Sequence, residues 1–462
     1  MRPVLSIAEM QAADAKAQAV VPLDVLVQRA GTAAGTVALA MLGGAYGRRV
    51  VVIAGKGNNG ADGRVAGELL RRRGAWVTVV GPDGVGMPTG PVDLVLDAAF
   101  GTGFRGTWNA PPVPPGVPVL AVDIPSGVDG ETGRQSGTSL PARRTITFAA
   151  LKPGLLAGDG RRLAGEVTVA DVGIPADGAR IHVIEDADVT ALVPARSPGD
   201  NKWSSAVMVV AGSPGMTGAA GLSARAAFRA GAGMVRLGVP GGDLTRTPAA
   251  EAVGVALPEV DWSDPVLEQL SRCAVLVVGP GIGRSDATGV EVRRLVAESP
   301  VPVLVDADGL FALGELSGPV EARSMVILTP HDGEYRRLMG EDPGDDRIDA
   351  ARRLAARAGA VALVKGSTTV VAEPSGRVLV AMAGSASLAT AGTGDVLSGV
   401  IGAFVARGVA PLEAAAVGAH VHGRASSHGP LEGLMAGDLP ELVSGVLSDL
   451  RRSGPAQVDA GG

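Results

Sequence analysis

Polar side chains follow three strand-like runs in the first half of the chain, at the points where glycine-containing loops begin. Residues 55–63 read Gly-Lys-Gly-Asn-Asn-Gly-Ala-Asp-Gly, the second loop begins at Asp97, and the third contains Asp123 and Ser126. Each residue alone is a common turn former or helix cap. Because the carboxyl ends of parallel strands converge on one crevice, the three loops together indicate a site. Asp123 is a candidate acid or base, and Asn59, Asp97 and Ser126 offer hard oxygen ligands for a cation.

A second set of candidate residues lies in the C-terminal half. Residues 391–399 read Ala-Gly-Thr-Gly-Asp-Val-Leu-Ser-Gly and open an apolar helix, while residues 365–369 end a strand with Lys-Gly-Ser-Thr-Thr. Glycines let main-chain N–H groups approach an anion, and the helix N-terminus adds its dipole. Asp395 is then placed to take a proton from a hydroxyl group; as a helix N-terminal carboxylate alone it would contribute only about 0.3–1 kcal/mol. His331 follows another strand and is expected at the same rim.

Strand-like and helix-like stretches alternate along the first half, which predicts an α/β domain with a Rossmann-like, mostly parallel sheet. Ser6 and Glu9 form a potential capping box for a helix that ends near residue 19, and a second helix is expected over residues 23–42. Two connections, residues 81–93 and 104–116, are short for the crossover helices that usually join parallel strands. The expected strands of this half are residues 50–54, 76–80, 94–97, 117–124, 145–148 and 166–170.

The second half repeats the alternation without repeating the sequence, which predicts a second, unrelated α/β domain. The polar, turn-rich residues 193–202 separate the halves, so we expect one domain over residues 1–194 and another over residues 195–462. The expected strands are residues 206–210, 275–278, 301–305, 325–328 and 361–364, and the expected helices are residues 219–230, 289–297, 334–338, 350–358, 394–406 and 412–426.

Bulk composition agrees with two packed domains and excludes several classes of protein. Of 462 residues, 46% are hydrophobic and only 3% are aromatic, so the cores must be built from aliphatic side chains. A net charge of −6 provides no basic surface for nucleic acid or for a membrane. Cys273 is the only cysteine, which excludes a disulfide framework and suits a reducing compartment. Residues 1–10 lack an apolar signal core, and no apolar run is expected to span a membrane. We therefore expect a cytoplasmic protein.

The motifs of the first half resemble the NAD(P)H-hydrate epimerase family. The resemblance rests on residues 58–63, 101–106, 123–127 and 150–155 and covers about residues 6–193; Ala61 stands where the family usually has glycine. It implies a potassium ion bound by Asn59, Asp97 and Ser126, with Asp123 as the catalytic acid or base. It also implies that the hydrated cofactor is held by Asn58, Asn59, Gly60, Ala61, Asp62, Gly101, Thr102, Gly103, Phe104, Arg105, Gly106, Thr107 and Asp123.

The second half resembles the ribokinase-like superfamily and, within it, the NAD(P)H-hydrate dehydratase branch. The resemblance rests on residues 306–310, 328–334 and 390–399; Phe311 stands where an asparagine is usual. It implies an α/β/α sandwich, with Asp395 as the catalytic base and ADP as co-substrate, accompanied by Mg²⁺. Residues implied to hold the hydrated cofactor are Ala220, Gly281, His331 and Asp395, and those implied to hold the nucleotide are Lys365, Gly366, Ser367, Thr368, Thr369 and Gly394.

Together the two resemblances imply repair of hydrated NADH and NADPH: the first domain interconverts the R and S hydrates, and the second dehydrates the S form with release of AMP and phosphate. A homo-oligomer is expected. Three alternatives stay open. The glycine loop of the second half also occurs in kinases of vitamin precursors, and the first half could be a non-catalytic ligand-binding module. The G-x-G-x-x-G pattern of Gly55, Gly57 and Gly60, with Asp83 beyond the next strand, could also belong to an NAD-dependent dehydrogenase.

Overall fold

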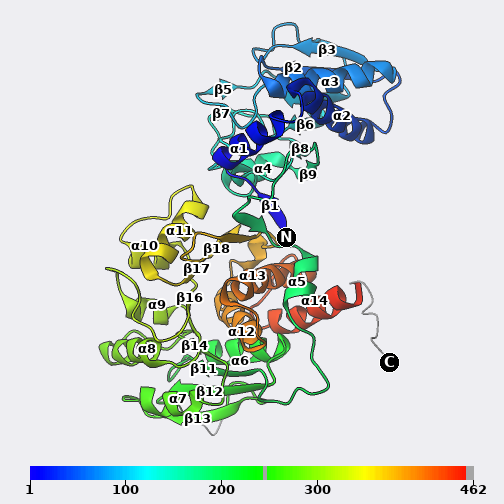
Figure 1. Ribbon diagram of the computed structural model, residues 1–462. Coiled ribbons are helices and arrows are strands. Elements are labelled where there is room, and N and C mark those ends of the chain that lie inside the picture. Colours follow the sequence, from blue (N-terminus) through cyan, green and yellow to red (C-terminus); the bar gives the residue numbers. More distant parts are fainter. Residues whose placement is uncertain (243–246, 454–462) are drawn as a thin grey trace. The chain divides into compact units, whose positions relative to one another are not determined.

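The computed structural model describes residues 1–242 and 247–453, and the chain forms two compact units (Figure 1). The smaller unit comprises residues 2–181, and the larger comprises residues 182–462 together with Met1. Both are α/β, as predicted, and each is described by itself below.

The smaller unit is built on a parallel sheet with the strand order β3-β2-β4-β6-β8-β9. All six strands were predicted, with shifts of at most a few residues at their ends. Its elements are β1 (Arg2–Val4), α1 (Ile7–Gln18), α2 (Leu23–Leu42), β2 (Arg49–Ala54), α3 (Asn58–Arg72), β3 (Trp76–Val80), β4 (Leu94–Ala98), β5 (Trp108–Asn109), β6 (Val119–Val122), β7 (Gly137–Thr138), β8 (Arg144–Phe148), η1 (Pro153–Leu155), α4 (Gly158–Ala164) and β9 (Glu166–Ala170).

The predicted capping box opens α1. The Ser6 side chain accepts a hydrogen bond from the Glu9 N–H at 3.1 Å, and the Glu9 carboxylate accepts one from the Ser6 N–H at 2.8 Å. Two main-chain donors that the first turn leaves free are therefore satisfied, and the chain entering the smaller unit is held in place.

The two faces of the smaller sheet are covered differently. Val50 and Val52 of β2 pack in the core with α2 and α3, while Val51 and Ile53 face a second core. That second core has no helix over residues 81–93 or 99–118, as the short connections predicted, and the pair β5–β7 lies in this region instead. Its cover includes Phe100, Phe104 and Trp108, with ring centroids of neighbours 4.5 and 5.7 Å apart. Aromatic side chains and a proline-rich loop thus replace the crossover helices.

Helix α2 corrects one expectation from the sequence. With 20 residues it is long and apolar enough to cross a membrane by length and composition, whereas no such run was expected. Its buried side includes Leu26, Ala30, Ala34, Ala38 and Leu42, which recur every four residues and pack in the core that α2 shares with α3. Packing of one face against the sheet accounts for its apolar character.

The larger unit is an α/β/α sandwich, as the resemblance implied. Its strands follow the order β10-β19-β18-β17-β16-β15-β14-β11-β12-β13, and Figure 1 shows α6, α12, α13 and α14 on one side of the sheet and α8 to α11 on the other. Its elements are β10 (Ile181–Val183), α5 (Asp186–Leu192), β11 (Ala206–Val210), α6 (Thr217–Arg229), β12 (Met234–Pro240), β13 (Val253–Leu257), α7 (Ser263–Leu270), β14 (Val275–Val278), α8 (Asp286–Glu298), β15 (Val303–Val305), α9 (Asp308–Leu313), β16 (Val326–Leu328), α10 (Asp332–Met339), α11 (Arg347–Ala358), β17 (Val361–Val364), β18 (Thr369–Ala372), β19 (Val378–Ala381), η2 (Ala386–Leu388), α12 (Thr393–Ala406), α13 (Pro411–His428) and α14 (Leu439–Ser453).

The division between the units falls between residues 181 and 182, earlier than the boundary expected at 194. The Ile184 N–H donates to the carbonyl of Val380 on β19 at 2.9 Å, and the Asp186 carboxylate lies 2.8 Å from Nε2 of His420 on α13. Helix α5 also packs against α13 and α14. The segment from 182 to 193 is therefore part of the larger unit, and the polar stretch after it is a loop inside that unit.

Candidate active sites

Three strand-end loops converge in the smaller unit, as predicted. In the sheet register, Asp97 on β4 stands opposite Ile53 on β2 and Ala121 on β6, so the loops that follow these strands share one edge. A Cβ added to Gly101 would lie 3.0 Å from the Asp123 carboxylate and 3.4 Å from the side chain of Asn59. A side chain at this position would press against both of these side chains, so glycine suits it.

Of the predicted cation ligands, Asp97 and Ser126 are buried and hydrogen-bonded to each other, whereas Asn59 is half-buried. Asp97 accepts bonds from the Ser126 hydroxyl at 2.6 Å and from the Ser126 N–H at 2.9 Å. Burial raises the pKa of Asp97 in spite of these bonds, and among the residues that the structure describes no cationic side chain lies within ion-pair distance of it. Both polar atoms of the Asn59 amide are buried without a hydrogen-bond partner. Unsatisfied amide atoms beside an uncompensated buried carboxylate suit a monovalent cation.

Asp123 is held by an ion pair that the sequence did not reveal. Its carboxylate lies 2.9 Å from Nζ of Lys152, which is 1% exposed, and it accepts bonds from the Thr147 hydroxyl at 3.2 Å and the Thr102 N–H at 3.3 Å. Burial acts to raise the pKa of Asp123, but Lys152 and these donors outweigh it, so the pKa lies below its ordinary value. Asp123 also has a φ of +70°, a conformation that costs about 1–3 kcal/mol outside glycine and clusters at functional sites.

A cavity of about 840 Å³ contains these groups. Its lining includes Asp14, Asp62, Asp123 and Lys152, and Lys152 acts electrostatically on Asp123 and Asp14. Burial, with repulsion from Asp123 and Asp14, raises the pKa of Asp62 to about 8. Neighbouring carboxyl groups with pKa values pushed apart are typical of acid–base sites, because one can donate a proton while the other accepts one.

The cavity separates the predicted ligand residues into two groups. Those that line it are Asn58, Asn59, Asp62, Gly101, Thr102, Gly103, Phe104 and Asp123, and those that do not are Gly60, Ala61, Arg105, Gly106 and Thr107. Gly60 has a packing role, since a Cβ there would lie 2.0 Å from the carbonyl oxygen of Gly55. Ala61 lies within helix α3 without positive φ, so its methyl group is compatible with the backbone. Asp83 accepts a bond from the Val85 N–H at 3.2 Å and serves its own turn.

Sequence reasoning missed Lys152 and Asp14. Lys152 belongs to the recognised stretch 150–155 but had been given no role. It follows β8, a fourth strand whose carboxyl end lies at the same edge of the sheet, so the rule that located the other loops would also have found it. Asp14 lies on α1, where no sequence pattern pointed inward.

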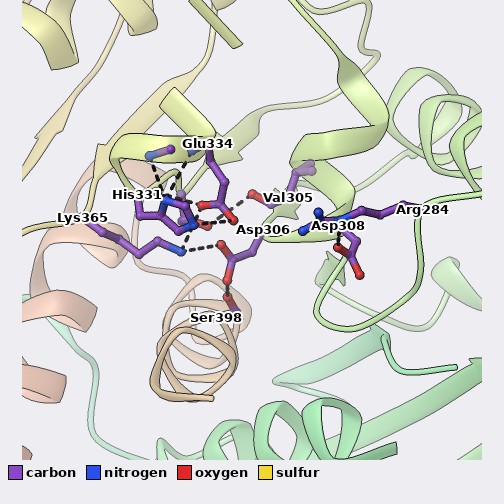
Figure 2. Close-up of polar contacts among 10 residues, drawn as sticks. Arg284, Val305, Asp306, Asp308, His331, Glu334, Lys365 and Ser398 are labelled. Atoms are coloured by element: carbon purple, nitrogen blue, oxygen red, sulfur yellow. Dashed lines mark hydrogen bonds and ion pairs between the residues drawn. The ribbon is translucent and has the colours of Figure 1, made fainter. Parts of the chain in front are cut away.

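In the larger unit, a polar network links the ends of β15, β16 and β17 to the first turns of α12 (Figure 2). Nζ of Lys365 lies 2.8 Å from the Asp306 carboxylate and 3.6 Å from that of Glu334. The other Asp306 oxygen accepts a bond from the Ser398 hydroxyl at 2.7 Å. Burial acts to lower the pKa of Lys365, but Asp306 and Glu334 outweigh it and raise the pKa above its ordinary value. A Cβ on Gly394 would lie 3.5 Å from Nζ of Lys365, so the two predicted nucleotide segments meet as expected.

Asp395 stands in the first turn of α12 beside this network. Burial, with repulsion from Asp306, raises the pKa of Asp395 to about 6, and Lys365 opposes this only in part. Gly392 before it has a φ of +90°, which glycine adopts without strain and which lets the loop turn into the helix. A carboxyl group with this pKa is mostly ionised at neutral pH and can accept a proton there.

The remaining predicted residues occupy neighbouring loops. The Ser213 hydroxyl donates to the Gly281 carbonyl at 3.1 Å, which joins the loops after β11 and β14. His331 caps α10 by accepting bonds from the N–H groups of Gly333 and Glu334 at 3.0 and 3.3 Å. Ala220 is fully buried on α6, so it supports the loop rather than offering a surface to a ligand. Asp306, Glu334 and Ser398 had no predicted role, although all three stand in recognised motifs.

Comparisons with known proteins cover both units. Residues 207–447 match the family described as NAD(P)H-hydrate dehydratase, and residues 23–86 and 82–154 match the family described as YjeF-related protein N-terminus. An ADP/ATP-dependent NAD(P)H-hydrate dehydratase from Bacillus subtilis, co-crystallised with ATP and Mg²⁺, is 25% identical with a TM-score of 0.51, covering 58% of this chain and 97% of that one.

Relatives that contain both units are also similar over most of their length. A bifunctional NAD(P)H-hydrate repair enzyme of Mycobacterium leprae is 38% identical over 489 residues, covering 98% of this chain and 99% of that protein. The enzyme of the same name from Moorella thermoacetica is 36% identical over 482 residues, covering 90% of each. The chain therefore belongs to the family of bifunctional NAD(P)H-hydrate repair enzymes.

Proposed function

We propose that the two units perform successive steps in the repair of hydrated NADH and NADPH. The smaller unit epimerises the R and S hydrates, and the larger unit dehydrates the S hydrate to NAD(P)H with ADP or ATP as co-substrate. The observation that carries this proposal is the presence, in one chain of this family, of two separate sites in which an aspartate stands beside a lysine at converging strand ends.

The dehydration is proposed to start at Asp395. The hydrate carries its hydroxyl on C6 of the reduced nicotinamide ring. Asp395 takes the hydroxyl proton while the oxygen attacks the terminal phosphoryl group of the nucleotide, so that ADP leaves as AMP. The phosphate ester then departs from C6, and a proton leaves C5 to restore the ring double bond. Main-chain N–H groups at the start of α12 and the ammonium of Lys365 lie where negative charge develops, and such positioning supplies most of the rate in phosphoryl transfer.

The epimerisation is proposed to use Asp123 as the group that moves protons. Lys152 keeps this carboxylate ionised within the cavity, so it can accept the proton of the C6 hydroxyl while the C6–N1 bond breaks, N1 takes up a proton and C6 becomes an aldehyde. Rotation about the C5–C6 bond and re-closure of the ring, with the proton transfers reversed, then give the other epimer. Expulsion of bulk water by the apolar wall of the cavity strengthens each of these electrostatic interactions. The ligand-module alternative for this unit is disfavoured, because a ligand module has no need for a strained, ion-paired aspartate.

Bound ions are proposed for both sites. Potassium would be held by Asn59, Asp97 and Ser126, where the unsatisfied amide and the uncompensated carboxylate fit it; bound there, it would fix the loops that position the substrate. The nucleotide would be held by Lys365–Thr369 and Gly394. The Bacillus subtilis relative was co-crystallised with ATP and Mg²⁺, which supports the same pair in this chain. A cytoplasmic homo-oligomer stays a prediction.

The test is a single progress curve. A mixture of both hydrate epimers is supplied with ADP and Mg²⁺, and NADH is followed by its absorbance. We expect both epimers to be consumed in full, with AMP and phosphate as products. Accumulation of a phosphorylated product without NADH would favour a small-molecule kinase. Consumption of only the S form would remove epimerisation from the proposal.

A further inference from the structure

A second cavity of about 260 Å³ opens in the larger unit beside the network around Asp395. The charged and aromatic residues that line it are Arg284, Phe311, His331, Glu334 and Arg337. Leu310 of α9 and Ala307, just before α9, add apolar surface. Figure 2 shows Arg284 with Asp308 on one side and His331 with Glu334 on the other. The cavity therefore lies between the loop that contains Gly281 and the start of α10.

Two guanidinium groups are arranged around one aromatic ring in this cavity. The Arg337 guanidinium lies 3.5 Å from the centroid of Phe311, and that of Arg284 lies 4.9 Å from it. Such contacts hold a guanidinium by cation–π attraction and leave its N–H edge free to bind a planar or tetrahedral anion with two hydrogen bonds.

Of the charged side chains that line the cavity, Arg337 is the one without an oppositely charged partner among the described residues. Asp308 pairs with Arg284 at 2.6 Å, and Glu334 is engaged by the His331 N–H at 2.9 Å and by Lys365. No carboxylate lies within ion-pair distance of Arg337 in the part of the chain that the structure describes. An exposed cation that is oriented by an aromatic ring inside a cavity calls for an anionic ligand.

The position of the cavity indicates which ligand supplies that anion. Glu334 lines the cavity and lies 3.6 Å from Nζ of Lys365, which in turn lies beside Gly394 at the start of α12, so the cavity is the next space beyond the proposed reaction centre. A hydrated dinucleotide whose nicotinamide ring lies at Asp395 extends well beyond that residue. It carries a pyrophosphate and, in the NADPH form, a phosphate on the adenosine ribose.

We propose that Arg337, oriented by Phe311 and assisted by Arg284, binds a phosphate group of the hydrated dinucleotide and sets its affinity for the dehydration site. This inference rests on the proposed function of the larger unit. It concerns binding, so loss of the contact changes the KM for the dinucleotide and leaves kcat, which depends on Asp395, unchanged.

The steady-state test uses Arg337→Gln in the full chain. We expect the KM for the S hydrate to rise about tenfold, the scale of one lost charge-assisted hydrogen bond, with kcat and the KM for ADP unchanged. A rise for NADPH hydrate alone identifies the ribose phosphate as the ligand, and an equal rise for both hydrates identifies the pyrophosphate. An unchanged dinucleotide KM, or a rise in the KM for ADP, overturns the proposal.

Two further variants separate this role from a general effect of charge or folding. Arg336→Gln removes the adjacent exposed arginine of α10, which pairs with Asp342, and should leave every KM unchanged. Phe311→Leu keeps both arginines but removes the ring that orients them, and should raise the dinucleotide KM by about threefold. An equal response to Arg336→Gln and Arg337→Gln would show only a non-specific loss of positive charge.

An equilibrium titration keeps the inference separate from the proposed function. NADPH and NADH carry the same phosphates as their hydrates and can be titrated by their fluorescence in the presence of ADP. Weaker NADPH or NADH binding by Arg337→Gln supports the phosphate contact even if the unmodified chain fails to dehydrate the hydrate. Unchanged binding of both dinucleotides overturns the contact even if dehydration proceeds normally.

Discussion

The two units differ in how a lysine acts on the carboxylate that is proposed to move protons. In each, a lysine at a strand end pairs with an aspartate, and one member of the pair is buried: Lys152 in its pair with Asp123, and Asp306 in its pair with Lys365. In the smaller unit the paired aspartate is itself the proposed acid or base, and its pKa is lowered. In the larger unit the proposed base is Asp395, which stands beside the pair and whose pKa is raised to about 6. A lysine that pairs with the base keeps it ionised, whereas a lysine that pairs with its neighbour leaves the base poised near neutrality.

The difference agrees with the proposed chemistry of each site. Epimerisation needs a group that is charged whenever substrate arrives, and the buried ion pair provides this over a wide pH range. Phosphoryl transfer places much negative charge near the base, and a second permanently ionised carboxylate next to Asp306 would oppose the approach of the nucleotide. A base with a pKa close to the working pH is neutral part of the time and still removes a proton effectively.

The largest expected effect is the loss of dehydration in Asp395→Asn. The amide keeps the shape of the side chain but cannot accept the hydroxyl proton, so nucleotide-dependent recovery of NADH should fall at least about a hundredfold. Epimerisation, followed by chromatography of the two hydrates without nucleotide, should be unchanged. Near-normal turnover would remove Asp395 from the mechanism, and a parallel loss of epimerisation would show that the two sites are not independent.

The matching change in the smaller unit is Asp123→Asn. We expect enzymatic epimerisation to fall about a hundredfold, so that the S hydrate is consumed with ADP while the R hydrate is limited by its spontaneous conversion. Full consumption of both epimers at the normal rate would make Asp123 a structural partner of Lys152. Thermal unfolding should accompany the measurement, because removal of one member of a buried ion pair can cost about 3–5 kcal/mol.

Sequence reasoning located most of the elements that position these sites. The central strands β11, β14 and β17 and the helix α2 agree with the expected ranges to the residue, because long apolar runs and continuous periodicity leave little ambiguity. It missed β12 and the edge strand β13, in which exposed and buried residues alternate only from Gly254 onward. It also missed the hairpin of β18 and β19, whose eight residues are almost all buried and show no alternation.

The candidate sites were predictable as loops but not as charge arrangements. The positions of Asp97, Asp123 and Asp395 follow from strand ends and a glycine-rich helix start, which are local patterns. The pairing of Asp123 with Lys152 depends on the positive φ of both Asp123 and Ala149, which no local pattern announces. The absence of a cationic partner for Asp97 depends on side chains from distant parts of the chain. The pKa difference that distinguishes the two sites was therefore beyond the sequence alone.

The rates of the two reactions should depend on pH in different ways. Asp395 must be ionised to act as a base, so kcat/KM for dehydration should fall about tenfold for each unit below pH 6 and level off above it. The lowered pKa of Asp123 predicts no such fall for epimerisation over the same range. Initial rates of both reactions between pH 5 and about 8 provide the measurement. A fall of epimerisation with the same midpoint would contradict the difference in how the two carboxylates are held.

The smallest expected effect concerns the proposed cation. Among residues 1–242 and 247–453, only the smaller unit combines a buried, uncompensated carboxylate with an unsatisfied buried amide, at Asp97 and Asn59, so replacing potassium with a large organic cation should lower epimerisation alone. The expected loss is about three- to tenfold, because the ion would fix the loops and not react itself. Asp97→Ala should reproduce this loss and abolish any further response to potassium, with dehydration of the S hydrate as the internal control. If Asp97→Ala lowers both activities equally, Asp97 serves the stability of the fold. If the variant still responds to potassium as the unmodified chain does, the ion acts elsewhere. Asp97 of the unmodified chain would then be protonated, since burial without a cation favours the neutral form of a carboxyl group.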